Sequence, residues 1–373
     1  LIGAMTIVEI IDYFNGFSTI KDFVRTNSRV RLLWIFSILA FILSAIIDNL
    51  TATIVLITIL RKIIKTREDR LWFAGLIIIA ANAGGAWSPI GDVTTTMLWI
   101  GNKVTTLNLI KYLFIPSLIC MVVPALIASR LPAFKGTIPE VEEDASDKVD
   151  QYSRIMLYLG LTAIIFVPIF KTVTHLPPYV GMMLSLAVVA TFGELYSNTR
   201  ISFTSIDHDS EESSHHSPVH RALSGIEMPS ILFFLGILMA VAALESLGVL
   251  FRFADGLTTT IPMLGTELTG SGTQVSDLVV LIMGVASAVI DNVPLVAASL
   301  GMFADPTDSP LWHFIAYSAG TGGSMLIIGS AAGVVAMGME KINFFWYLKK
   351  ISLLALIGFL AGAVTFMFMR IIL

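Results

Sequence analysis

A carboxylate and an amide stand side by side at two places in otherwise apolar sequence, and both pairs could bind a cation. Asp48-Asn49 interrupts an apolar stretch at 30–64, and Asp291-Asn292 interrupts another near the other end of the chain. A charged side chain at the centre of a bilayer costs at least about 2.5 to 3.5 kcal/mol, so such a position usually has a function. Carboxylate and amide oxygens are ligands that a small hard cation prefers. We therefore expect sodium at these four residues.

The same residue types also suit a purely structural role, because Asp and Asn are favoured at helix N-termini. Capping and ion binding are compatible with each other. Capping alone, however, does not require the pattern to recur, and here most of the eight positions from Ser44 to Thr51 match those from Ser287 to Pro294. This repetition favours a binding role.

The charges that flank the two motifs predict that they enter a membrane from opposite sides. Basic residues mark the cytoplasmic side, and they surround the first motif: Arg25, Arg29 and Arg31 before it, and Arg61, Lys62, Lys65, Arg67 and Arg70 after it. Around the second motif there is no Lys or Arg between Arg252 and Lys341. Because each segment has both flanks on one side, we expect two re-entrant hairpins, at 30–64 and 275–303. Their non-helical tips must line a polar cavity.

Each predicted hairpin is followed by an apolar stretch that glycines and polar residues interrupt. At 71–101 the interruption runs from Asn82 to Asp92, and at 311–340 its counterpart ends at Ser330. Gly costs about 1 kcal/mol and Pro about 3 kcal/mol inside a helix. We therefore expect two helices broken at mid-membrane, with their freed carbonyl groups beside the bound ion. Asp92, in the first break, is a third carboxylate expected there, after Asp48 and Asp291.

Two copies of a hairpin and a broken helix in opposite orientation are typical of an inverted-repeat transporter. The predicted fold is an all-α polytopic membrane protein with a first repeat at 1–130, a cytoplasmic linker at 131–152 and a second repeat at 153–373. Five crossings and one hairpin per repeat give the odd number that inverts the second copy. By comparison with the second repeat, two helices and the start of a third are expected to precede residue 1.

The composition agrees with this class and argues against others. Of the 373 residues, 55% are hydrophobic and 13% are charged, which fits a helical membrane protein and not a soluble domain. A single cysteine, Cys120, excludes a disulfide framework. The histidines of segment 200–221 lack metal-ligand spacing, so we expect a flexible loop. With no nucleophile or metal cluster visible, we expect neither an enzyme nor a resident cofactor, and no nucleic-acid partner.

The predicted site also has the chemistry for exchange. A carboxylate that loses its solvent favours the protonated form, so a proton and a cation can compete for one position. Competition for a single site is sufficient for antiport. Glu9 and Asp12 on the first helix, and Glu245 on its counterpart, are possible additional carboxylates that face the site or lie near the membrane interface.

Four motifs together resemble the NhaD-type sodium/proton antiporters. They are Asp-Asn-Leu-Thr at the first tip, Gly-Gly-Ala-Trp-Ser-Pro-Ile-Gly-Asp in the first break, Asp-Asn-Val-Pro at the second tip and Leu-Ile-Gly-Ala-Met-Thr-Ile-Val-Glu at the start. This family belongs to the ion transporter superfamily, with arsenite pumps and divalent-anion/sodium symporters. The resemblance covers essentially the whole chain, apart from the expected N-terminal helices.

The resemblance implies a homodimer of scaffold and transport domains that exports sodium or lithium in exchange for protons. By motif position, the residues that line the path would be Asp48, Asn49, Thr51, Ser88, Asp92, Asp291, Asn292, Ser324 and Ser330. The expected location is the inner (plasma) membrane of a bacterium, with an organellar membrane such as that of a plastid as the alternative.

An anion carrier of the same superfamily, coupled to sodium or protons, is the alternative function. Its substrate would be a dicarboxylate or arsenite. Relatives of the dicarboxylate class resemble this chain but have Ser-Asn-Thr at the hairpin tips, without a carboxylate. Two aspartates at the tips would repel a dianion, which favours the antiporter.

Overall fold

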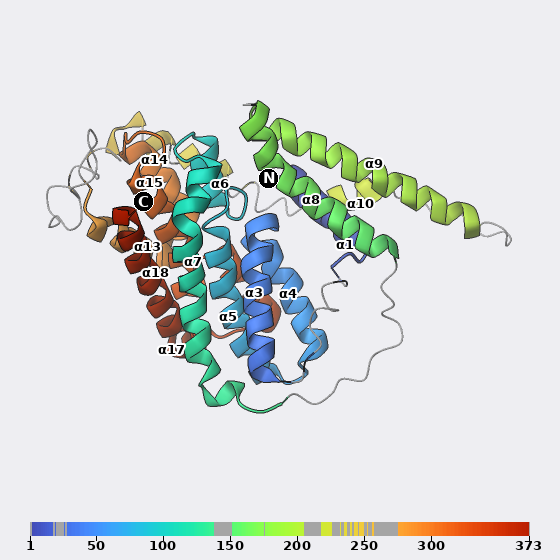
Figure 1. The fold of residues 1–373 in the computed structure, drawn as a ribbon, viewed down its shortest axis with the longest axis horizontal. Coiled ribbons are helices and arrows are strands. Elements are labelled where there is room, and N and C mark those ends of the chain that lie inside the picture. Colours follow the sequence, from blue (N-terminus) through green and yellow to red (C-terminus); the bar gives the residue numbers. More distant parts are fainter. Residues whose placement is uncertain are drawn as a thin grey trace. The chain divides into compact units, whose positions relative to one another are not determined.

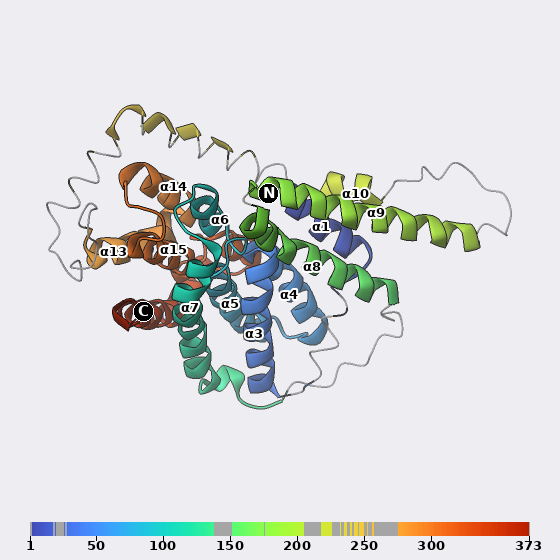
Figure 2. The ribbon, with the colours of Figure 1, turned by 45° about the horizontal axis from the view of Figure 1, so that its top comes forward.

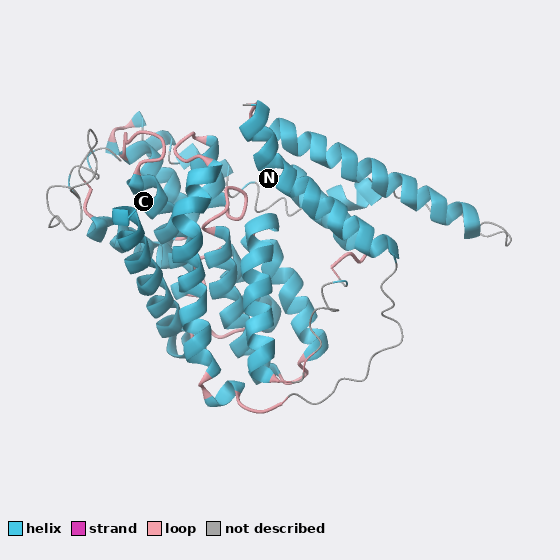
Figure 3. Cartoon of the chain, in the orientation of Figure 1, coloured by secondary structure: helices cyan, strands magenta, loops and turns pink. Residues whose placement is uncertain are grey.

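The computed structural model describes residues 2–17, 19, 26, 28–137, 151–174, 176–204, 218–225 and 275–372, with scattered residues between 232 and 256. Within these ranges the secondary structure is helical, and β pairing is limited to one bridge between Ser28 and Thr137 (Figure 3). Five described helices are long and apolar enough to cross a membrane: Arg29–Ile47, Thr106–Ser129, Tyr152–Thr174, Tyr179–Ser197 and Ser352–Ile372. The coarse prediction, an all-helical multi-pass membrane protein, is confirmed.

The chain forms two compact units, each of which combines segments from both halves of the sequence. The first unit comprises Leu1–Arg25 and Val141–Leu232, and the second comprises Thr26–Glu140 and Phe233–Leu373. These units therefore differ from the predicted division into repeats at 1–130 and 153–373. The repeats describe a duplication in the sequence, and that division stays a prediction.

In the first unit, helix α1 (Ile2–Tyr13) packs against α8 (Gln151–Thr174), α9 (Pro178–Thr204) and α10 (Pro218–Gly225). The Ser153 hydroxyl donates to the carbonyl of Phe14, which follows α1, at 2.7 Å. Gly160 lets α8 come close to α1, because a Cβ at this position would overlap the side chain of Ile11. Contact at a glycine is a common way for membrane helices to pack.

The expected flexible loop at 200–221 is wrong at both of its ends, which are helical. Helix α9 continues to Thr204 because the residues from 194 to 204 include no Gly or Pro that would end it. Helix α10 begins at Pro218, a residue type favoured at the first position of a helix. His220 lies on α10, whereas His208, His215 and His216 lie outside the described residues.

In the second unit, two pairs of helices are each joined by a single aspartate. Helices α3 (Arg29–Ile47) and α4 (Asn49–Ile63) meet at Asp48, and they lie side by side (Figures 1 and 2). Helices α13 (Asp277–Ile290) and α14 (Asn292–Met302) meet in the same way at Asp291. The predicted turns at both Asp-Asn pairs are confirmed.

The two predicted helix breaks are also confirmed. The first separates α5 (Arg67–Gly85) from α6 (Val93–Ile100). The second separates α15 (Pro310–Gly322), with a short 3₁₀ turn η2 (Gly323–Met325), from α16 (Ala331–Glu340). Helices α7 (Thr106–Ser129), α17 (Phe344–Lys350) and α18 (Ser352–Ile372) also belong to this unit, with α18 packed along α7.

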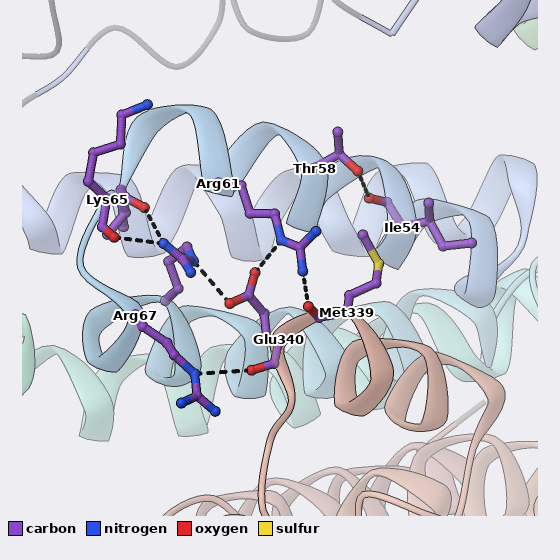
Figure 4. Close-up of polar contacts among 9 residues, drawn as sticks. Ile54, Thr58, Arg61, Lys65, Arg67, Met339 and Glu340 are labelled. Atoms are coloured by element: carbon purple, nitrogen blue, oxygen red, sulfur yellow. Dashed lines mark hydrogen bonds and ion pairs between the residues drawn. The ribbon is translucent and has the colours of Figure 1, made fainter.

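An ion cluster joins the first hairpin and the first broken helix to the end of α16 (Figure 4). The buried carboxylate of Glu340 accepts hydrogen bonds from Nε of Arg61 at 2.6 Å and from Nε of Arg70 at 3.0 Å. Arg61 also donates to the carbonyl of Met339, and Arg67 donates to the carbonyl of Lys341 at 2.9 Å. Part of the basic flank used to predict orientation therefore also stabilises the fold.

A second polar cluster joins the loop after α14 to the loop after α6. The Asp308 carboxylate accepts hydrogen bonds from the backbone N–H and the hydroxyl of Thr105, at 2.7 and 2.8 Å, and from the Asn108 amide at 2.8 Å. The Asp308 N–H donates to the carbonyl of Lys103 at 2.8 Å. Each hairpin-to-helix connection is thus tied to the broken helix of the other half.

Glycines in the breaks allow each broken helix to contact its own hairpin through backbone atoms. A Cβ at Gly84 would overlap the carbonyl group of Phe41 on α3, and a Cβ at Gly322 would overlap the carbonyl oxygen of Gly284 on α13. The neighbouring glycines approach backbone in the same matched way, Gly85 at the carbonyl of residue 91 and Gly323 at that of residue 329. Only glycine fits such a contact without moving the backbone.

We predict that Gly84→Ala and Gly322→Ala each destabilise the protein by about 1 to 3 kcal/mol, because the new methyl group would force two backbones apart. The matched control is Gly338→Ala on α16, where a Cβ would meet nothing within 4 Å. This change should be neutral or stabilise by up to about 1 kcal/mol, as expected for Gly to Ala in a helix. Thermal unfolding in detergent measures all three, and equal midpoints for the three variants would contradict the packing described.

Candidate functional site

Each hairpin turn is held beside the helix break of its own half by a matched serine. The Ser44 hydroxyl donates to the carbonyl of Ala81 on α5 at 2.5 Å. The Ser287 hydroxyl donates to the carbonyl of Ala319 on α15 at 3.2 Å and, more closely, to that of Gly284 on its own helix at 2.8 Å. Both serines are fully buried. These contacts place each turn next to the break of its own half.

The aspartates at the two tips have an unusual backbone conformation. Asp48 has φ 88° and ψ 159°, and Asp291 has φ 78° and ψ 147°. Residues with a side chain rarely adopt this region, at a cost of order 1 to 3 kcal/mol, and they do so mainly where function constrains them. A residue that relieves this backbone strain, such as Gly or Asn, occupies neither tip. The presence of aspartate at both tips agrees with a need for the carboxylate.

The tip of the second hairpin meets the break of the first broken helix at Asp92. Asp92 is 3% exposed, and its Oδ2 atom accepts hydrogen bonds from the Thr94 hydroxyl and from the side-chain amide of Asn292, both at 2.9 Å. Asn292 is itself 2% exposed, and Asp291 precedes it. The carboxylates of Asp92 and Asp291 are close enough to repel each other. Two acidic residues that are 199 positions apart therefore share one site.

The tip of the first hairpin meets the break of the second broken helix through a neutral bridge. The amide of Asn49 donates to Oδ1 of Asn82 at 3.1 Å, and the amide of Asn82 donates to the Ser330 hydroxyl at 2.9 Å and to the carbonyl of Ile78 at 3.1 Å. Asn49, Asn82 and Ser330 are all buried. Asn82 stands at the start of the predicted break, and its residue type alone did not indicate this bridging role.

Asp48 and Asp291 are held differently, although both cap a helix. Oδ1 of Asp48 accepts from the backbone N–H of Thr51 at 2.7 Å, and Oδ2 accepts from the Thr51 hydroxyl at 3.1 Å. Pro294 occupies the position that matches Thr51 and offers neither donor. Asp291 instead accepts from the backbone N–H of Asn292 at 2.8 Å. Helix capping, the structural role that the sequence also allowed for these aspartates, is therefore present at both tips.

The remaining predicted site residues lie within the breaks. Ser88 is buried, and its hydroxyl accepts a long hydrogen bond from the N–H of Ile90 at 3.4 Å. Ser324 is buried, and its hydroxyl donates to the carbonyl of Thr321 at 2.7 Å. Both serines stabilise the local shape of their own break, and their predicted place along an ion path stays a prediction.

The additional carboxylates expected from the sequence stay predictions. Glu9 and Asp12 lie on α1, which belongs to the first compact unit, and Asp12 is exposed. Glu245 lies outside the described residues. Thr94, which the sequence analysis did not consider, does contact Asp92; only its position two residues after the aspartate could have indicated it.

The set of ligands suits a singly charged hard cation. Asp92, Asp291 and the tip residues around them supply carboxylate, amide and hydroxyl groups and no sulfur or imidazole. In the described part of the chain there is also no group of three or more His, Cys, Asp or Glu that could hold a metal ion. Oxygen ligands of this kind favour sodium or lithium over transition metals.

Comparison with known proteins identifies relatives over nearly the whole chain. A family model described as "Citrate transporter" matches residues 1–312. Sodium/proton antiporters 1 and 2 of Arabidopsis thaliana are 44% identical over 371 residues and 42% identical over 373 residues, each covering 98% of this chain. The chain spans 60% of the length of the first and 83% of the second.

A bacterial protein extends this similarity. The Na(+)/H(+) antiporter NhaD of Vibrio parahaemolyticus is 35% identical over 346 residues, covering 87% of this chain and 78% of its own length. These relatives are transporters and not enzymes, which agrees with the expectation from the sequence. The chain therefore belongs to the citrate transporter family and, within it, to a group of relatives that includes the NhaD sodium/proton antiporters.

Proposed function

We propose that this protein exchanges sodium for protons across a membrane, and that the site at Asp92 and Asp291 carries the two cargoes in turn. The observation that carries the proposal is the 2.9 Å hydrogen bond between Asp92 and Asn292, which brings two carboxylates from opposite halves together. Two like charges near each other in a desolvated site need a balancing positive charge. A proton or a sodium ion can supply it, and the names of the relatives support this cargo.

We further propose that the two halves are inverted repeats with re-entrant hairpins. The matched turns at Asp48 and Asp291 and the matched serines at 44 and 287 support the duplication. The distribution of Lys and Arg supports the inversion. From the family resemblance we add lithium as a second cargo, a homodimer as the assembly, and a bacterial or plastid membrane as the location.

The anion carrier is the alternative, and the citrate transporter description of the family model favours it. The site argues against it because the described hydrogen-bond partners of Asp92 and Asp291 include no Lys or Arg that would bind a carboxylate substrate. Two aspartates would repel a citrate or dicarboxylate ion. We therefore rank cation exchange first.

Ion flux into proteoliposomes tests the function directly. We predict that Asp92→Asn and Asp291→Asn each lower sodium-driven proton flux more than tenfold, since they keep the shape and remove the charge. Asp48→Asn should retain part of the flux, because Asn caps a helix nearly as well as Asp. The control is Glu68→Gln, which removes an exposed carboxylate at the start of α5. A pH-sensitive dye inside the vesicles reports sodium, lithium, potassium and citrate gradients. Citrate uptake without sodium-driven proton movement would favour the anion carrier.

The pH dependence of sodium binding tests the sharing of one site by the two cargoes. If one proton must leave before one sodium ion binds, the apparent affinity for sodium should rise with pH. The rise should approach tenfold per pH unit below the apparent pKa of the site and level off above it. Calorimetry in buffers of different ionisation enthalpy also measures the protons released. A sodium affinity that is constant from about pH 6 to pH 9, without proton release, would exclude competition at this site.

Labelling with a membrane-impermeant maleimide tests the inverted topology. We predict that Glu68→Cys, at the exposed start of α5, and Ala304→Cys, at an exposed position in the loop after α14, react from opposite sides of the membrane. The native Cys120 is buried and should react slowly in both variants. Intact and inside-out vesicles are compared. Reaction of both cysteines from the same side would show that the two halves are not inverted.

A further inference from the structure

The two contacts between hairpin tip and helix break are two versions of one arrangement. Asp92 and Ser330 hold matching positions, because each is the N-cap after its break, with φ −147°, ψ 152° and φ −152°, ψ 153°. Asn49 and Asn292 match as the first residues of α4 and α14. Asn82 matches Gly320, since each lies two residues before its Gly-Gly pair. The asparagines are identical, but Asp92 and Ser330 differ in charge and Asn82 and Gly320 differ in size.

On the side of Asp92 and Asp291, here called the acidic side, Asp92 contacts the hairpin tip directly. Asp92 accepts directly from Asn292, and the residue that matches Asn82, Gly320, has no side chain to place beside it. A Cβ at Gly320 would lie 3.1 Å from Cβ of Ala86 and 3.7 Å from Oδ2 of Asp92. A larger side chain at this position would therefore compete with Asp92 for the same space.

On the side of Asn49, Asn82 and Ser330, here called the neutral side, the side-chain amide of Asn82 occupies the corresponding space. Asn82 bonds both to the hairpin, at Asn49, and to the break, at Ser330. Its second donor bond goes to Ile78, so its amide is satisfied within the protein and fully buried. A satisfied neutral group in this position needs no ion to balance or bridge it.

The charge at the first tip does not change this conclusion. Both carboxylate oxygens of Asp48 accept hydrogen bonds from Thr51, whereas Pro294 offers no such donors to Asp291. On the other side, the carboxylates of Asp92 and Asp291 are close enough to repel each other.

We infer that Asn82 takes the place of a second cation: it ties the first hairpin tip permanently to Ser330, so that the chain binds one sodium ion, at Asp92, and only the second tip responds to sodium. This inference rests on the proposed function, which places the cation on the acidic side. It makes Asn82 a positioning residue that determines how many ions are bound.

The first test converts the neutral side into a copy of the acidic side. The double variant Asn82→Gly, Ser330→Asp gives both halves a glycine and an aspartate at the matched positions. Equilibrium dialysis with radioactive sodium on the purified protein should give one ion per wild-type chain and two per chain of the double variant. Two ions per wild-type chain, or one ion per folded chain of the double variant, would overturn the inference.

The second test does not depend on the double variant. Ile46→Cys and Val289→Cys occupy matched positions two residues before the tip aspartates, and the effect of sodium on the maleimide rate of each is compared. We expect sodium to slow the reaction at 289 severalfold and to leave that at 46 unchanged. Adding Asn82→Ala should speed the reaction at 46 with or without sodium, whereas the exposed Thr58→Ala on α4 should not.

The outcomes separate this inference from the function on which it rests. Equal slowing by sodium at 46 and 289, in protein that binds sodium, would overturn the role of Asn82 and leave the exchange function standing. An absence of sodium binding in the wild-type protein would overturn the proposed function, and the inference with it.

Discussion

One constraint shapes the second compact unit: the polar groups at its interrupted helices need hydrogen-bond partners, although most of the surrounding sequence is apolar. A helix that stops inside a membrane leaves backbone N–H and C=O groups without partners, and lipid cannot supply them. Here the hairpin turns and the helix breaks lie together, so that polar groups of one form hydrogen bonds with polar groups of another. Ser44 and Ser287 bond to carbonyls of α5 and α15, and Asp48 and Asp291 accept from N–H groups of α4 and α14.

Close packing makes this gathering possible. At Gly84 and Gly322 the backbones of hairpin and broken helix touch, and there is no room for a methyl group. The polar clusters around Glu340 (Figure 4) and around Asp308 tie the outer ends of the same segments across the two halves. The carboxylates are therefore held by rigid elements, which is how a protein keeps a binding geometry defined.

The two halves are alike in shape and unlike in charge, and this difference gives the site its chemistry. Both tips have an aspartate, so if the break residues matched as well, both breaks would have an aspartate or neither would. The substitutions Asp92 for Ser330 and Gly320 for Asn82 concentrate negative charge on one side and fill the other with a neutral amide. A single acidic site beside a fixed neutral contact suits the exchange of one cation for protons.

The class of protein, both turns at Asp-Asn and both helix breaks could be predicted from the sequence, because they follow from local rules: apolar length, the helix cost of Gly and Pro, and charge in apolar surroundings. Asp92 and Asp291 were also predicted in this way. The pairing of Asp92 with Asn292, and the bridge that Asn82 forms from Asn49 to Ser330, became visible with the packed helices. Those partners lie up to 248 positions apart, and hydrogen bonds at that separation are set by how whole helices pack, which no local pattern encodes.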